Sequence, residues 1–284
     1  MSIYSVLNNQ LRNILRKVVY TTYASLCRNK LKEPQKILFL LSHPRAGTTL
    51  TVNLLCTNPE IIGVGEMKVR YHSNHDLNML KGRVYSKHRK MTITEKFLLD
   101  NINVSWFLPN PNILDNKNIF CLFLIRDGES TISSLLNPNF PLNKAFPGSK
   151  IEDKLTFTYK YYQRRLHDLE KYAKIINDKE RAMYISYEQL LYDTQKVFKS
   201  LKKFLKTEFF FSESYSPIPI EGVQNLIGSV AGDIYSEKIM LGKIIRQPSK
   251  LISLPSEIVE GCQESYSNAQ MNLQKYCRCV DDYV

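Results

Sequence analysis

An arginine, a glycine and two threonines lie close together, directly after a short apolar run. The apolar run spans residues 36–41, and Pro44 and Gly47 interrupt regular structure after it. A helical pattern begins at Thr48. A strand that leads through a glycine turn into a helix directs several backbone N–H groups to one point, and the helix dipole adds partial positive charge there. These residues therefore predict an anion-binding site, for which phosphate is the usual ligand.

The composition of the turn restricts the kind of phosphate loop. A nucleoside-triphosphatase loop carries a lysine directly before its hydroxyl residue, and no lysine occupies that place here. Instead, Arg45 lies two residues before Gly47, and Thr48 and Thr49 supply two hydroxyl groups. A guanidinium can donate two parallel hydrogen bonds to an oxyanion, whereas an ammonium acts as a point charge. An ordinary strand-to-helix turn with an arginine in it is the alternative interpretation.

The segment 44–50, which reads Pro-Arg-Ala-Gly-Thr-Thr-Leu, resembles the 5′-phosphosulfate loop of the sulfotransferases. Members of this family transfer a sulfuryl group from 3′-phosphoadenosine 5′-phosphosulfate (PAPS) to a hydroxyl or an amine. The resemblance implies that the 5′-phosphosulfate is bound by Arg45, Ala46, Gly47, Thr48 and Thr49. It also implies a second motif, further along the chain, for the 3′-phosphate.

The strongest predicted strand, residues 118–125, ends in a motif of this kind. Arg126 and Asp127 follow it, and Ser134 lies eight residues after Arg126. In sulfotransferases an arginine at a strand end and a serine eight residues later hold the 3′-phosphate, so the resemblance assigns this role to Arg126 and Ser134. A nucleoside-triphosphatase interpretation would make Asp127 a metal-binding carboxylate. The arginine before it and the missing loop lysine argue against that interpretation.

A carboxylate follows the next short apolar segment. Residues 61–65 predict a strand, and Glu66 comes directly after it. Glu66 would then lie on the same sheet edge as the phosphate loop, where a base could remove the proton of an acceptor hydroxyl. The Gly-Glu pair resembles that of the protein-tyrosine and some carbohydrate sulfotransferases, although Val69 stands where the protein-tyrosine branch has an arginine. His72 and His75 are alternative candidates for the base. The other interpretation of Glu66 is an ordinary solvated surface residue.

Two further nucleotide contacts follow from the resemblance. A predicted strand at 181–186 precedes Tyr187, and in the family a tyrosine at this place faces the nucleotide. A buried structural tyrosine is the alternative. A basic loop also closes over PAPS in the family, and the resemblance makes Lys238 its candidate here, with Ser236 and Lys243 as others.

The predicted elements indicate an α/β fold with three layers, in which helices cover both faces of a central parallel sheet, as in P-loop-like nucleotide-binding proteins. Periodicity predicts long helices at 151–176, 194–205 and 256–275. The segment 73–118 is the least regular and is basic, and we expect it to select the acceptor. Within it, a helix is expected at 94–100.

Residues 1–35 are predicted to form a basic amphipathic leader helix, followed by a single sulfotransferase-like domain at 36–284. The leader could lie on an anionic membrane surface, or it could pack on the domain with a solvated basic face. The net charge of +12, from 39 Lys and Arg against 27 Asp and Glu, favours anionic partners. No apolar run approaches the roughly 18 residues that span a bilayer. We expect a cytoplasmic protein, with peripheral membrane contact if the leader lies on a membrane.

Taken together, the motifs predict a PAPS-dependent sulfotransferase in which Glu66 is the base and Arg45 stabilises charge on the leaving oxygen. The scheme requires no metal, and the close pair Cys277 and Cys279 has no second pair at zinc-ligand spacing. The acceptor is open: protein tyrosine, carbohydrate, lipid and small alcohol all fit. The alternatives are a nucleotide kinase or triphosphatase that needs magnesium, and a non-catalytic basic anion-binding protein. We expect no nucleic-acid partner, because no module of that kind is recognisable.

Overall fold

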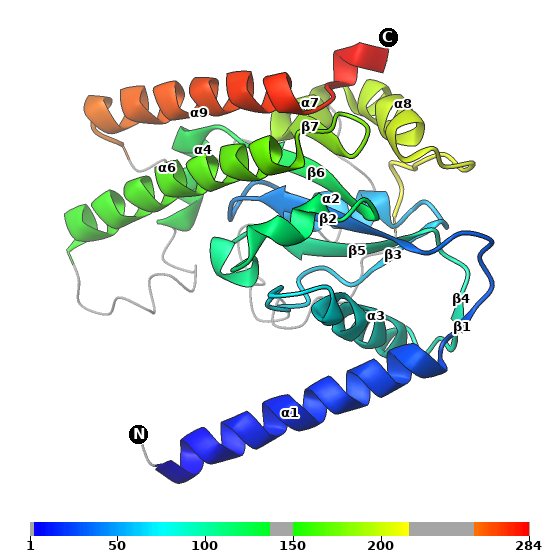
Figure 1. The fold of residues 1–284 in the computed structure, drawn as a ribbon. Coiled ribbons are helices and arrows are strands. Elements are labelled where there is room, and N and C mark those ends of the chain that lie inside the picture. The colour runs from blue at the N-terminus through cyan, green and yellow to red at the C-terminus, as the bar shows by residue number, and fades with distance from the viewer. Residues whose placement is uncertain (1–2, 137–149, 216–252, 284) are drawn as a thin grey trace.

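The computed structural model describes residues 3–136, 150–215 and 253–283, and within these ranges it describes side chains for residues 14–282. It has three layers, with a five-stranded parallel sheet between helices (Figure 1). The strand order is β3-β5-β2-β6-β7. The strands are β2 (Lys36–Ser42), β3 (Ile61–Gly63), β5 (Phe97–Ile102), β6 (Ile119–Ile125) and β7 (Ala182–Ser186). The predicted α/β class with a central parallel sheet is confirmed.

The helices include the three long ones that periodicity predicted. Two of them have the predicted bounds, and the last extends one residue further. Around the sheet lie α2 (Thr48–Leu55), α3 (His75–Lys87), α4 (Gly128–Leu135), α6 (Ile151–Ile176), α7 (Tyr187–Tyr192), α8 (Thr194–Leu205) and α9 (Ser256–Tyr276).

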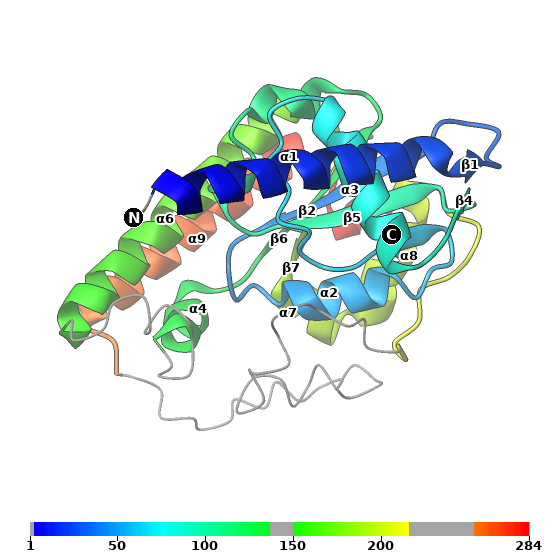
Figure 2. The same ribbon diagram turned by 90° about the horizontal axis from the view of Figure 1, so that it is seen from below.

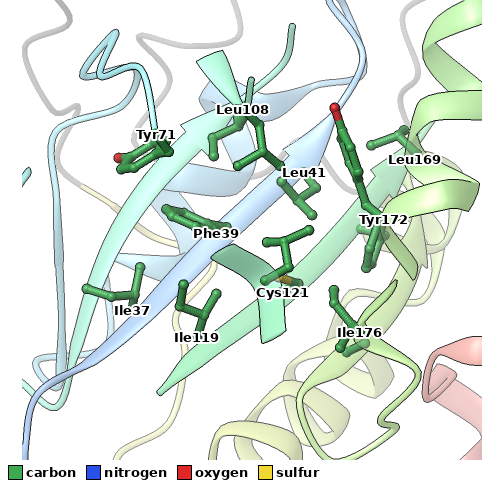
Figure 3. Close-up of a cluster of buried hydrophobic side chains, with 14 of the residues drawn as sticks. Ile37, Phe39, Leu41, Tyr71, Leu108, Ile119, Cys121, Leu169, Tyr172 and Ile176 are labelled. Carbon is green, nitrogen blue, oxygen red and sulfur yellow. The ribbon is translucent and has the colours of Figure 1, made fainter. Parts of the chain in front are cut away.

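Each face of the sheet has its own hydrophobic core, because side chains alternate between the faces along a strand. Ile37, Phe39 and Leu41 of β2 point to one face, where they pack with residues of α3, α4, α6 and α9 (Figure 3). Leu38 and Leu40 point to the other face, which α2, α7 and α8 cover. The central strand is buried on both faces, which explains why its sequence is a continuous apolar run.

The prediction of a helix at 94–100 is wrong. Phe97–Ile102 forms strand β5, all six of its residues are buried, and it pairs with both β2 and β3. Lysine, glutamate and leucine favour a helix locally. Burial between two parallel strands overrides this preference, because the backbone groups of β5 find their partners in the neighbouring strands.

The segment 73–118 is also more regular than expected. Besides α3 and β5 it contains β4 (Thr92–Ile93) and two short 3₁₀ helices, η1 (Ser105–Phe107) and η2 (Pro111–Asp115). Strand β4 pairs with β1 (Arg28–Asn29) in a separate two-stranded sheet. A third 3₁₀ helix, η3 (Val280–Tyr283), packs on α8.

An N-terminal helix, α1 (Ile3–Leu26), packs along α3 at the outside of the molecule (Figure 2). A Cβ built at Gly82 of α3 would lie 1.8 Å from the carbonyl oxygen of Tyr20, so the two helices meet backbone to backbone at this point. Among the described residues, no helix has the length and hydrophobicity needed to cross a bilayer. The division into a leader at 1–35 and a domain at 36–284 stays a prediction.

Substitution Gly82→Ala should destabilise the protein by about 1–3 kcal/mol, because the new methyl group overlaps backbone that cannot move without shifting α1. Chemical denaturation of the full chain measures this loss. Gly261→Ala in α9 is the matched control, since its Cβ would meet only side-chain atoms, the hydroxyl end of the Tyr159 ring, and no backbone. Both changes gain helix propensity, so an unchanged stability of Gly82→Ala would contradict the close approach.

Candidate active site

The turn after β2 adopts the left-handed backbone conformation at two residues, Arg45 (φ 68°) and Gly47 (φ 88°). Gly47 is the N-cap of α2, and a Cβ at this position would lie 2.3 Å from the ring of Tyr187. Glycine is required here, because a side chain would strain the backbone and overlap the tyrosine. The turn therefore holds the start of α2 against the start of α7.

The residues on either side of Gly47 form a positive pole at the start of α2. Ala46 is fully buried, Thr48 is buried and begins the helix, and Thr49 is half-buried. The first turn of α2 contains no acidic residue, so its unpaired N–H groups and the helix dipole leave this point positive. The strand, turn and helix are those predicted, and binding of a phosphosulfate by these residues stays a prediction.

The structure brings Arg126, Ser134 and Tyr187 against this turn. The Arg45 Nε donates to Ser134 Oγ at 2.8 Å, and the Arg126 Nη1 donates to the carbonyl oxygen of Arg45 at 3.4 Å. The Arg126 guanidinium lies 4.5 Å from the centroid of the Tyr187 ring. Residues from three separate segments, each at the carboxyl end of a strand, therefore meet at one place.

Two guanidinium groups share this place, which makes it strongly positive. Burial, and then the nearby charge of Arg126, lower the pKa of Arg45. The Nε of Arg126 is buried and has no hydrogen-bond partner among the described residues. Like charges held together with an unused buried donor are stabilised by an anion that accepts from them. The geometry thus suits a phosphate or sulfate group.

His43 supports Arg126 from the side of β2. The buried His43 accepts from the Arg126 backbone N–H through Nε2 at 3.0 Å, so the ring proton belongs on Nδ1, which lies 3.0 Å from the carbonyl oxygen of Pro44. Burial lowers the pKa of His43 to about 4, with smaller contributions from the charges of Arg165 and Arg126. The imidazole is therefore neutral at pH 7 and adds no charge to the two guanidinium groups.

Tyr162 of α6 completes the support of Arg126. Its hydroxyl donates to the Arg126 carbonyl oxygen at 2.9 Å, and its ring meets that of His43 edge to face at 5.1 Å. Both backbone groups of Arg126 are thus held by side chains. Neither residue was predicted from the sequence as part of the site. The position of His43 inside the loop was a usable signal, whereas Tyr162 only shares the helical spacing of ordinary core residues.

A buried arginine fixes the ends of two strands beneath the site. Arg165 of α6 donates to the carbonyl oxygens of Ser42 at 2.8 Å and of Ile102 at 2.7 Å, which close β2 and β5. It also donates to Ser105 Oγ at 2.9 Å. Burial lowers the pKa of Arg165, and the carbonyl dipoles compensate its charge. Arg165 therefore fixes the turn after β2 relative to the segment after β5.

Glu66 lies on the same edge of the sheet, after the left-handed Gly65 (φ 89°). It is half-buried, and its carboxylate accepts a hydrogen bond from the Asn103 amide. Burial raises the pKa of Glu66, against smaller opposing effects of Asn103 and Lys68. A carboxylate with a raised pKa in a partly enclosed place is a suitable general base. The rival bases His72 and His75 are exposed beside the start of α3.

Asp100 holds the loop that carries Glu66. Its buried carboxylate accepts from the Met67 N–H at 2.9 Å and from the Tyr71 hydroxyl at 2.6 Å. Burial raises the pKa of Asp100 to about 7, although these hydrogen bonds oppose the shift. No usable signal for this residue was present in the sequence, because its segment was expected to be a helix. Asp100 becomes a buried carboxylate that needs partners only when β5 pairs with β2 and β3.

Lys238, Ser236 and Lys243, the candidates for a closing loop, lie outside the described residues. In the part of the chain that the structure describes, no three His, Cys, Asp or Glu side chains gather closely enough to hold a metal ion.

Comparisons with known proteins reveal a likeness of structure rather than of sequence. No protein-family model and no curated protein matches the chain. Among solved structures, it is similar to the sulfotransferase domain from the curacin biosynthetic pathway, with 17% identity, a TM-score of 0.54, and coverage of 84% of this chain and 99% of that one. A mouse sulfotransferase, SULT7A1, complexed with PAP also matches, with 12% identity, a TM-score of 0.48, and coverage of 91% and 93%. The chain has the fold of a sulfotransferase domain, as its motifs predicted.

The support by His43 should make stability depend on pH. An unfolded histidine has a pKa of 6.5 and the folded one about 4, so the unfolded chain binds more protons between these values and stability falls as the pH falls through this window. From pH 7 to pH 5 this group alone should cost about 2 kcal/mol of unfolding free energy.

Denaturant titrations at pH 7 and pH 5 of wild type and His43→Gln measure this effect. Glutamine can still accept from the Arg126 N–H but does not titrate, so the variant should lose about 2 kcal/mol less than wild type. The contribution of Asp100 has the opposite sign, because its raised pKa favours the folded state as the pH falls, but it is common to both proteins. An equal pH dependence would show that His43 is not a buried neutral acceptor.

Proposed function

We propose that this protein is a sulfotransferase that moves a sulfuryl group from PAPS to a hydroxyl of an acceptor. The observation that carries the proposal is the meeting of Arg45, Arg126, Ser134 and Tyr187 at the carboxyl ends of neighbouring strands. Ligands of open parallel sheets bind at this edge. A nucleotide with separate phosphate groups at its 5′ and 3′ positions offers an anion for each of the two guanidinium groups.

The proposed assignments follow the placement of each group. The 5′-phosphosulfate would accept from the N–H groups at the start of α2, from Thr48 and Thr49, and from Arg45. The 3′-phosphate would accept from Arg126 and Ser134. Ser134 now accepts from Arg45 and retains its own hydroxyl proton, which it can donate to a phosphate oxygen.

The same assignments give Tyr187 a place beside the nucleotide. Its ring contacts the Arg126 guanidinium and lies against Gly47. It can therefore also pack against a nucleotide held between the two motifs. Lys238 would contribute a further positive charge from the closing loop. The cytoplasmic location expected from the sequence stays a prediction.

In the proposed reaction the acceptor oxygen attacks sulfur in line with the bridging oxygen. The bond from sulfur to the bridging oxygen breaks, the adenosine bisphosphate leaves, and Glu66 takes the acceptor proton. Arg45 and the start of α2 stabilise the negative charge that develops on the leaving oxygen. Arg126 and Ser134, by fixing the 3′-phosphate, set the position of the sulfur relative to the base. The scheme needs no metal, and the acceptor stays open.

Adenosine 3′,5′-bisphosphate should raise the melting temperature of the full chain by several degrees, since a ligand at 100 times its dissociation constant adds about 2.7 kcal/mol. Ser134→Ala should lose most of this shift, whereas Ser133→Ala should keep it. Ser133 is the matched control because it is the neighbouring serine of α4 and its hydroxyl has no hydrogen-bond partner among the described residues. A shift with ADP and magnesium but none with the bisphosphate would instead indicate a kinase or triphosphatase.

Substitution Glu66→Gln should reduce turnover by about 10²–10⁴-fold, because the amide cannot take the acceptor proton. The melting shift with the bisphosphate should remain. Transfer of labelled sulfate from PAPS to a panel of tyrosine peptides, glycans and small alcohols measures turnover. Glu60→Gln is the control, since Glu60 lies just before β3, at the amino ends of the strands and away from the candidate site. Its carboxylate accepts from the Glu208 N–H there. Turnover that survives Glu66→Gln would remove Glu66 as the base.

A further inference from the structure

We propose that the outward side of α1, together with the basic end of α3, is a docking surface for an anionic lipid membrane. The proposal does not rest on the sulfotransferase activity. It is carried by an exposed row of aliphatic side chains and by the charge that surrounds it.

The first observation is the exposure of the aliphatic side chains of α1. Ile14, Leu15, Val18 and Val19 expose 59%, 60%, 57% and 59% of their surfaces, and Leu26 exposes 63%. The spacings of one, three and four residues bring the first four together on one side of the helix. A cluster of this kind on a surface helix marks an interaction site rather than scattered exposure.

The second observation is that α1 packs on the domain through its other side. Tyr20 and Tyr23 are partly buried against the core, the Tyr20 backbone meets Gly82 of α3, and the Arg83 guanidinium lies 5.3 Å from the Tyr20 ring. A helix that only covers its own domain turns its aliphatic side inward. Here the aliphatic side faces away, so packing of α1 on the domain does not account for it.

The third observation is the charge of the two helices and of the segments that follow them. Residues 14–32 contain five basic and no acidic residues, and residues 75–91 contain five basic residues and a single acidic one, Asp76. These two stretches together hold nine of the twelve net positive charges of the chain. Two of the basic residues are already engaged within the domain, since Lys90 pairs with Glu95 and Arg83 donates to the Met67 carbonyl oxygen. The two stretches lie side by side, because α1 packs on α3 and β1 pairs with β4 where the stretches end (Figures 1 and 2).

Aliphatic side chains flanked by basic ones match the chemistry of an anionic lipid surface. The apolar side of such a helix enters the boundary between headgroups and acyl chains, while lysine and arginine attract the headgroups. A second copy of the chain is the poorer occupant, because it would bring the same positive charge to the same face. Nucleic acid would use the charge but leave the aliphatic side chains in water.

The surface is connected with the candidate site through α3. Arg83, which contacts Tyr20 of α1, donates from Nη1 to the Met67 carbonyl oxygen at 2.6 Å, directly after Glu66. A membrane bound at the outward side of α1 would therefore be linked to the loop of the proposed base through Tyr20 and Arg83.

The test is sedimentation of the full chain with vesicles of phosphatidylcholine, with and without phosphatidylserine. We expect the protein to sediment with the anionic vesicles, to remain mostly in solution with the neutral ones, and to be released by high salt. No nucleotide or acceptor is needed, so the result is independent of whether the protein transfers sulfate.

Two double variants separate the contributions. Arg16→Gln with Lys17→Gln should weaken partition to anionic vesicles about thirtyfold, and Leu15→Gln with Val18→Gln should weaken it by about tenfold or more. Met271→Gln is the matched control, because Met271 is 61% exposed on α9, which contacts β7 at the other edge of the sheet. Since all these side chains are exposed, the melting temperatures should stay unchanged.

Three outcomes would overturn the proposal. Absence of sedimentation with anionic vesicles would show that the surface does not dock on them, and equal binding to neutral vesicles would remove the role of charge. Dimerisation in analytical ultracentrifugation that Leu15→Gln with Val18→Gln abolishes would assign the aliphatic side to a second copy instead.

Discussion

The parallel pairing of β2 with β6 is the constraint on which the candidate site depends. The register places Ser42 opposite Leu124, so the two strands end at almost the same height. Neighbouring strands lie about 4.8 Å apart, so the turns that follow β2 and β6 lie side by side. For this reason the Arg126 guanidinium reaches the carbonyl oxygen of Arg45, although the two residues belong to distant segments.

Buried polar groups keep this arrangement in place against the repulsion of two cations. His43 and Tyr162 hold the backbone N–H and carbonyl of Arg126, while Arg165 binds the last carbonyl groups of β2 and β5. Hydrogen bonds of this kind are strong in a low dielectric and costly to leave unmade. The site is therefore rigid at its backbone, and its charges are oriented before any ligand arrives, which is what stabilising a developing charge requires.

Much of the fold could be predicted because its strands and long helices carry strong local patterns. The apolar runs at β2, β6 and β7 are buried on both faces of a parallel sheet, and the periods of α6 and α8 match their observed bounds. Strand β5 could not be predicted in the same way. Glu95 and Lys96 before it and its own two leucines favour a helix locally, and only pairing with β2 on one side and β3 on the other decides its conformation.

The sequence by itself determined the local motifs: a glycine turn before α2, an arginine at the end of β6, and a glutamate after β3. Each is a short-range pattern, and short-range patterns report the chain's own backbone preferences. Only the tertiary structure decided which side chains support them. His43 and Asp100 have their partners 83 and 33 residues away, and the burial that shifts their pKa values arises only when the layers close. The same holds for α1. Packing of its tyrosines against the domain decides which side of the helix faces outward, and that side is the aliphatic one.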